Sequence, residues 1–132
     1  MSETLVLDSN AVIALFGGNK GVARIMASAS AIAVPAVVCG ELDAGMQGDT
    51  ARERKEREFF DGLLALPKVS ALPMTRKTAA YYRRIYDYIR SRGDKIPTND
   101  IWIAAAALEN GAAICTSDKH LLGLPLIRTV TF

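Results

Sequence analysis

The fold is decided by Ile96-Pro97-Thr98-Asn99-Asp100-Ile101-Trp102-Ile103-Ala104-Ala105-Ala106-Ala107-Leu108. This stretch predicts a helix that is buried on nearly every side, because almost every residue after its first turn is apolar. Four successive alanines would let the helix lie close against a sheet. Thr98 is the expected N-cap. Asp100 falls in the first turn, where the helix dipole and the free backbone N–H groups favour a carboxylate.

The residues after this helix predict a short buried strand. Asn110-Gly111 supplies a left-handed stop for the helix. Residues 112–116 then form an apolar run that ends at Ser117-Asp118. One buried helix therefore begins with a carboxylate, and the strand after it ends with another.

Strands and helices alternate along the rest of the chain. A central strand is expected at residues 4–8, and further strands at 31–34, 69–72 and 127–132. Helices are expected at residues 11–16, 22–30, 35–46, 50–66 and 75–92. This alternation predicts a three-layer α/β domain with a mainly parallel central sheet and helices on both faces. No linker, low-complexity segment or internal repeat interrupts it, so residues 1–132 are expected to form one domain.

Four acids are expected to share one pocket. Asp8 and Asp118 end strands, and Asp100 begins a helix. Glu41 lies on the helix expected at 35–46, on one face with the apolar side chains around it, and should point inward. Ligands of open parallel sheets gather beyond the carboxyl ends of the strands, so the four carboxylates should meet there.

Four carboxylates in one place indicate a metal site, because they cannot all be ionised together without cations to neutralise them. Carboxylate oxygens select hard divalent ions, Mg²⁺ or Mn²⁺. Such an ion can activate a water as a nucleophile and stabilise charge on a phosphate. His120 is the single histidine of the sequence, which excludes a histidine-rich metal site and a serine or cysteine nucleophile with a histidine base.

The charge balance fits an anionic substrate. The net charge is +2, but 14 acids less these four leaves 10 against 16 Lys and Arg, a balance of +6 for the rest of the chain. A basic rim around an acidic, metal-binding centre would attract such a substrate. Candidate phosphate contacts, which could equally be solvated surface charges, are Arg76, Lys77, Lys95 and Lys119.

Other features of the sequence indicate a cytosolic protein. No apolar run reaches the roughly 18 residues of a membrane span, and the first residues lack the pattern of a signal peptide. Cys39 and Cys115 lack zinc-motif spacing and are expected to be small buried residues rather than a disulfide or metal pair.

At four places the sequence resembles the motifs of a known family. These are Asp8-Ser9-Asn10, Glu41, the run from Asn99 to Ala105, and Thr116-Ser117-Asp118. They look like the four motifs of the PIN domain and, more closely, those of the VapC-type toxin ribonucleases of bacterial and archaeal toxin–antitoxin pairs. The resemblance covers the whole length in the right order.

The resemblance implies a Mg²⁺-dependent endoribonuclease, with Mn²⁺ able to substitute. Asp8, Glu41, Asp100 and Asp118 would be its catalytic, metal-binding acids, and Asn10 and Thr116 would help to hold the site. RNA would be the substrate, a cognate antitoxin would be the protein partner, and the chain would form a homodimer. We expect an apolar groove for the antitoxin with Phe59, Phe60 and Leu63 in one wall, although core packing is an alternative for each.

Three other functions remain open. A housekeeping RNA-processing nuclease would use the same acids. A non-catalytic RNA- or protein-binding module of PIN-like fold is disfavoured, because none of the four acids is missing. A phosphoacceptor signalling domain needs an aspartate at the end of a middle strand, whereas the middle strand here, residues 69–72, ends in Pro73-Met74.

Overall fold

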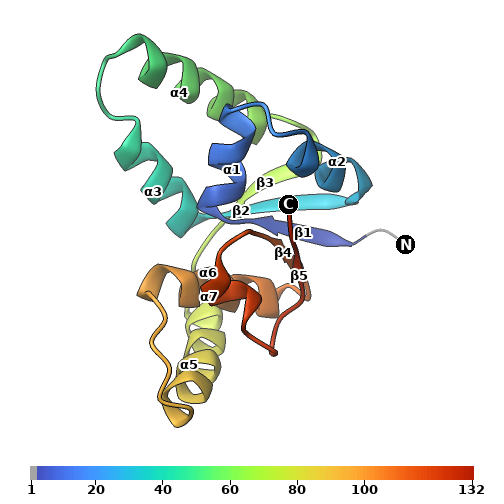
Figure 1. Cartoon of the computed structure of the whole chain (residues 1–132), viewed down its shortest axis with the longest axis vertical. Coiled ribbons are helices and arrows are strands. Elements are labelled where there is room, and N and C mark those ends of the chain that lie inside the picture. Colours follow the sequence, from blue (N-terminus) through green and yellow to red (C-terminus); the bar gives the residue numbers. More distant parts are fainter. Residues whose placement is uncertain (1–2) are drawn as a thin grey trace.

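The computed structural model describes residues 3–132, which form a parallel sheet of five strands in the order β3-β2-β1-β4-β5 (Figure 1). The strands are β1 (Thr4–Leu7), β2 (Ala31–Pro35), β3 (Val69–Leu72), β4 (Ala113–Cys115) and β5 (Thr129–Val130). The helices are α1 (Ser9–Phe16), α2 (Lys20–Ser28), α3 (Ala36–Gly45), α4 (Ala51–Leu64), α5 (Arg76–Ser91), α6 (Thr98–Glu109) and α7 (Lys119–Leu122). The predicted α/β class and the parallel sheet are confirmed.

The strand order explains how the helices are divided between the two faces. The connections from β1 to β2 and from β2 to β3 run toward one edge, whereas the chain then returns past β1 to form β4 and β5. Parallel crossovers are right-handed, so reversing the direction of travel moves the helices to the opposite face. Figure 1 shows this: α1–α4 lie above the sheet in the view, and α5–α7 lie below it.

The core lies where the middle strands meet α6. Leu5, Val6 and Leu7 of β1 are buried, as are all three residues of β4. Helix α6 packs against β1 and α5, and its residues Ala104–Ala107 are fully buried. Alanine side chains allow close approach of a helix to a sheet, so the predicted burial of this helix is confirmed.

The start of α6 differs from the prediction. Pro97, not Thr98, is the N-cap, and no side chain caps this end of the helix. Pro97 has a ψ of 142°, which lies outside the helical range, so Thr98 is the first residue of the helix. At the other end, Gly111 has a φ of +59° and confirms the left-handed stop. Helix α4, expected at residues 50–66, begins with a capping box formed by Thr50 and Glu53.

Several other helix and strand boundaries, and the place of one strand in the sheet, differ from the prediction. Helix α2 begins at Lys20 because the Asn19 side chain accepts a hydrogen bond from the Val22 N–H at 3.0 Å. Helix α7 was not predicted, and β5 is shorter than expected. Strand β3, the middle strand in chain order, lies at an edge of the sheet, whereas β1 holds the centre as predicted. A phosphoacceptor domain was therefore disfavoured on the wrong strand, since Asp8 directly follows the central strand β1.

Both cysteines are free thiols, with Cys115 buried and Cys39 only half-buried. Within residues 3–132, no helix has the length and apolar character that crossing a membrane requires.

Gly111 provides a test of this fold. We expect Gly111→Ala to lower the free energy of unfolding by about 1 kcal/mol, because an L-residue is strained at a positive φ. Gly62, inside α4 with open space around it, is the matched control, and Gly62→Ala should leave stability unchanged or raise it by up to about 1 kcal/mol. Urea unfolding of both variants measures this; equal effects would contradict the assignment of the α6 terminus.

Candidate active site

The site begins where β1 pairs with β4. Leu7 is in register with Cys115, so the next residues, Asp8 and Thr116, lie side by side at the carboxyl ends of the two strands. The Thr116 hydroxyl donates a hydrogen bond to Asp8 Oδ2, and the Ala11 N–H donates to Asp8 Oδ1 at 2.8 Å. The space beyond the carboxyl ends of β1 and β4, called the β1–β4 gap below, lies where the direction of the crossovers reverses. This is the usual place for a ligand in an open α/β sheet.

The chain after β4 brings two more polar side chains to this gap. The Asp118 N–H donates to the Thr116 hydroxyl oxygen at 2.9 Å, and the Asp118 carboxylate accepts from the His120 N–H at 2.8 Å, which caps α7. The cap turns the His120 ring back toward the acids, so its Nδ1 lies 3.1 Å from Asp118 and 3.7 Å from Asp100. One ligand atom from each of these three residues lies within 4.8 Å of the others.

The charges of these acids affect the pKa values of Asp100 and Asp8. Burial, and after it the negative charges of Asp118, Glu41 and Asp8, raise the pKa of Asp100 from 3.8 to about 6, opposed by the charge of His120. Burial also raises the pKa of Asp8, which is only 3% exposed, although its hydrogen bonds from Thr116 and Ala11 lower it. Asp118 and Glu41 add to the rise at Asp8. All four predicted acids therefore lie near enough for their charges to repel.

Glu41 does not point inward as predicted. Val38 and Leu42 form the buried face of α3, and Glu41 is exposed. Its carboxylate accepts a hydrogen bond from the Ser9 hydroxyl at 2.7 Å, which holds it at the margin of the site next to the start of α1. The prediction assumed that Glu41 shares the buried face of the apolar residues three or four positions away. Such neighbours cover a wider arc of a helix than the part that is buried, so one of them can be exposed.

The two supporting polar residues differ in their surroundings. Thr116 is fully buried and joins Asp8 to the Asp118 backbone. Asn10 is exposed on the first turn of α1. Thr116 therefore has a clear structural part in the site, while the role of Asn10 stays a prediction.

The four predicted rim residues separate into two pairs. Lys95 and Lys119 line a pocket that also includes His120. Arg76 and Lys77 lie at the start of α5, where the Thr78 hydroxyl donates to Glu109 at 2.7 Å. Glu109 is the last residue of α6, nine residues from Asp100, which corresponds to about 13 Å of helix. Grouping Arg76 and Lys77 with the site was wrong, because the chain leaves the edge strand β3 and begins α5 beside the far end of α6.

The structure adds His120 to the residues of the site, although His120 was not among the predicted site residues. The available signal was the spacing Asp118-Lys119-His120 directly after a strand. An aspartate that caps a helix turns the next residues around its own carboxylate, so a side chain two positions later can return to it.

The predicted groove wall is also only partly right. Phe60 and Leu63 are core residues, 2% and 5% exposed. Phe59 is 45% exposed, and its ring packs edge-on against Phe16, with 5.6 Å between the ring centroids. A small pocket lies beside these two rings, and a second one extends from Phe16 along α3 to Glu41. Phe59 thus stands on a surface that reaches the acidic site.

Comparison with known families agrees with this arrangement. The model of the PIN domain family matches residues 5–125. The chain belongs to the PIN domain family. Ribonuclease VapC4 of Mycobacterium tuberculosis is 28% identical to it over 98 residues, which are 74% of this chain and 75% of that protein.

Solved structures share this PIN fold over nearly the whole chain. VapBC2 from Rickettsia felis, bound to a DNA fragment from its promoter, superimposes with a TM-score of 0.82 at 19% identity and covers 98% of both chains. VapBC-5 of Mycobacterium tuberculosis, from the VapBC family of toxin–antitoxin systems, has a TM-score of 0.75 at 22% identity and also covers 98% of both chains.

The charge repulsion predicts how stability depends on pH. The pKa of Asp100 is raised to about 6 from 3.8, so metal-free folded protein holds this proton more tightly than the unfolded chain does. The stability that Asp100 contributes should therefore fall as pH rises from about 4 to about 6 and stay low above that. We expect Asp100→Asn in EDTA to be more stable than the parent at pH 7, by at most about 3 kcal/mol, and equally stable at pH 4.

Thermal unfolding of the parent and Asp100→Asn across this pH range measures the difference. Asp61→Asn, on the exposed surface of α4, is the control and should stay within about 0.5 kcal/mol of the parent. A variant destabilised at pH 7 would mean that Asp100 is held by a favourable ion pair rather than repelled.

Proposed function

We propose that this PIN domain protein is a Mg²⁺-dependent endoribonuclease and the toxin of a type II toxin–antitoxin system, acting on RNA in the cytoplasm. The observation that carries the proposal is the convergence of Asp8, Glu41, Asp100 and Asp118 at the β1–β4 gap of a PIN fold. The similarity of the chain to Ribonuclease VapC4 and to VapBC structures supports both the proposed reaction and the proposed toxin role.

The residues present fit a divalent cation. The pKa values of Asp8 and Asp100 are raised partly by neighbouring acids, and a cation would relieve that repulsion. Asp8, Asp100 and Asp118 would hold it, with Glu41 completing the acidic set. The donors are mainly carboxylate oxygens, which favour Mg²⁺ and allow Mn²⁺. When bound, such an ion supplies Lewis-acid stabilisation of phosphate charge and lowers the pKa of a coordinated water.

The chain itself orients these groups. Thr116 fixes one oxygen of Asp8, and the cap of α7 fixes Asp118. Ser9 holds Glu41 from the outside of the site, where Glu41 can accept a proton or position a water beside the substrate. Lys95 and Lys119 would bind phosphates of the RNA, and Asn10 would contribute a further polar contact.

The antitoxin would bind the surface that contains Phe16 and Phe59. This surface continues toward Glu41, so a protein segment lying on it could reach the acids with a basic side chain. The homodimer that the family resemblance implies stays a prediction. A housekeeping nuclease would share the site but lack an antitoxin encoded by a neighbouring gene.

Metal-dependent cleavage is the direct test of the reaction. Purified protein should cut single-stranded RNA, lose this activity in EDTA and regain it with Mg²⁺ or Mn²⁺. Asp100→Asn should remain folded, cut RNA at least about a hundredfold more slowly, and show little rise in melting temperature with Mn²⁺. Full activity in EDTA, or recovery with Zn²⁺ alone, would contradict the proposed metal site.

Partner binding can be tested at Phe59. We expect Phe59→Ala to weaken the complex with the protein encoded by the adjacent gene by about 2 kcal/mol, since exposed aromatic side chains often dominate such interfaces. Leu66→Ala is the control, because Leu66 is equally exposed but lies beyond the end of α4. Titration calorimetry with both variants gives the answer. Equal affinities would remove Phe59 from the interface.

A further inference from the structure

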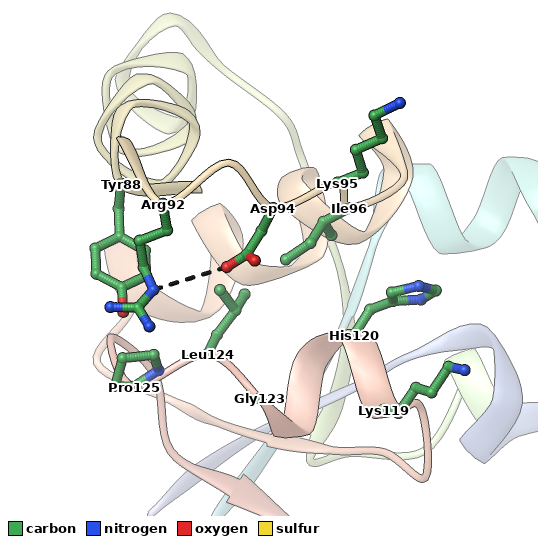
Figure 2. Close-up of a pocket in the computed structure, with 10 residues that line it drawn as sticks. All are labelled: Tyr88, Arg92, Asp94, Lys95, Ile96, Lys119, His120, Gly123, Leu124 and Pro125. Atoms are coloured by element: carbon green, nitrogen blue, oxygen red, sulfur yellow. Dashed lines mark ion pairs between the residues drawn. The ribbon is translucent and has the colours of Figure 1, made fainter. Parts of the chain in front are cut away.

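A second feature adjoins the acids: a pocket of about 610 Å³ between the end of α5, the segment before α6, and α7 (Figure 2). Pockets that hold small ligands span about 300–1,000 Å³, so this one can take a group as large as a nucleotide. None of the four acids lines it. It therefore adjoins the proposed metal site at His120 but does not include the acids themselves.

The pocket is basic. Arg92, Lys95 and Lys119 line it, and Asp94 is the one acid among the described residues that do so. Asp94 lies 3.7 Å from the Arg92 guanidinium and offsets one of these charges. The remaining balance is positive, in a protein whose neighbouring centre carries four acids. A phosphate is thus favoured inside the pocket, whereas a phosphate at the neighbouring acids needs the cation of the proposed metal site.

One end of the pocket offers flat surfaces for a base. The Arg92 guanidinium lies over the Tyr88 ring, 5.6 Å from its centroid, and Leu124 and Pro125 add apolar surface. Aromatic rings and guanidinium planes are the surfaces on which unpaired bases stack. Figure 2 shows Tyr88, Arg92 and Pro125 together at this end.

The other end of the pocket meets the acids. His120 lines the pocket, and its Nδ1 lies 3.1 Å from Asp118 and 3.7 Å from Asp100. In Figure 2, His120 and Lys119 stand at the end opposite Tyr88, and the Lys95 side chain starts beside α6 and extends away from Tyr88. A chain whose phosphate lies at the acids would pass His120 and enter the pocket with its next nucleotide.

We propose that this pocket binds the nucleotide next to the scissile phosphate of single-stranded RNA. Lys95 and Lys119 hold its phosphate, and its base lies against Arg92 and Tyr88. The pocket thereby sets a base preference on one side of the cut. This inference rests on the proposed ribonuclease function and adds a specificity site to it.

The test compares pocket variants with matched variants of α5 residues that lie outside the pocket. Arg92→Ala/Lys95→Ala removes two pocket charges, and Arg83→Ala/Lys77→Ala removes two exposed charges of α5 outside it. Tyr88→Leu removes the ring but keeps apolar packing, and its control is Tyr86→Leu at an exposed position. Melting curves first establish that all four variants are folded.

Binding is measured by fluorescence anisotropy with a fluorescein-labelled ten-nucleotide single-stranded RNA of mixed sequence, in EDTA so that no cleavage occurs. We expect the pocket double variant to bind roughly tenfold more weakly than its control, and Tyr88→Leu several-fold more weakly than Tyr86→Leu. Equal affinities within each pair would overturn the proposal, whether or not the protein cleaves RNA.

Cleavage of a random-sequence RNA pool with Mg²⁺ tests specificity separately. Sequencing of the cut ends should show that Tyr88→Leu loses base preference at one position beside the cut, mainly through a higher KM, while Tyr86→Leu retains it. If the parent cuts no RNA, the proposed function fails, and the binding comparison still judges the pocket. Pocket variants that bind RNA normally but lose the protein partner would assign the pocket to a protein interface and overturn the proposal.

Discussion

The site depends on the pairing of β1 with β4. This pairing places Asp8 next to Thr116, whose hydroxyl group bonds the Asp8 carboxylate and accepts the Asp118 N–H. A buried carboxylate is costly unless it is hydrogen-bonded. Here the same carboxylate also caps α1 through the Ala11 N–H. One buried polar contact therefore joins two strands, begins a helix and aligns two of the four acids.

The acids lower stability, and the core offsets this cost. Burial and mutual repulsion raise the pKa values of Asp8 and Asp100, which means that the ionised site opposes folding. The surrounding core is apolar and buried: it consists of Leu5–Leu7 of β1, all of β4 and the middle of α6. Strain of this kind is typical of functional sites, where a bound ligand recovers what the free protein loses. The electrostatics thus explain why a cation would bind tightly.

The two faces of the sheet give the acids two different neighbours. On the α1–α4 side, the rings of Phe16 and Phe59 lie among charged side chains of α4, on a surface that leads to Glu41. On the α5–α7 side, Arg92, Lys95 and Lys119 form a basic pocket that leads to His120. This division follows from the reversal of the crossovers at the β1–β4 gap. It suits the proposed function, in which RNA would bind on one side and a protein partner on the other.

The sequence by itself determined the α/β class, the buried helix and the elements on which the four acids lie, with Asp8 and Asp118 after strands and Asp100 at the start of a helix. These features depend on periodicity and capping, which are local. Only the tertiary structure decided that Glu41 is exposed, that His120 returns to the acids, that Arg76 and Lys77 lie elsewhere, and that Phe60 is core while Phe59 is surface. Each of these depends on strand order and helix packing, and residues far apart in the chain set those through contacts that no local pattern specifies.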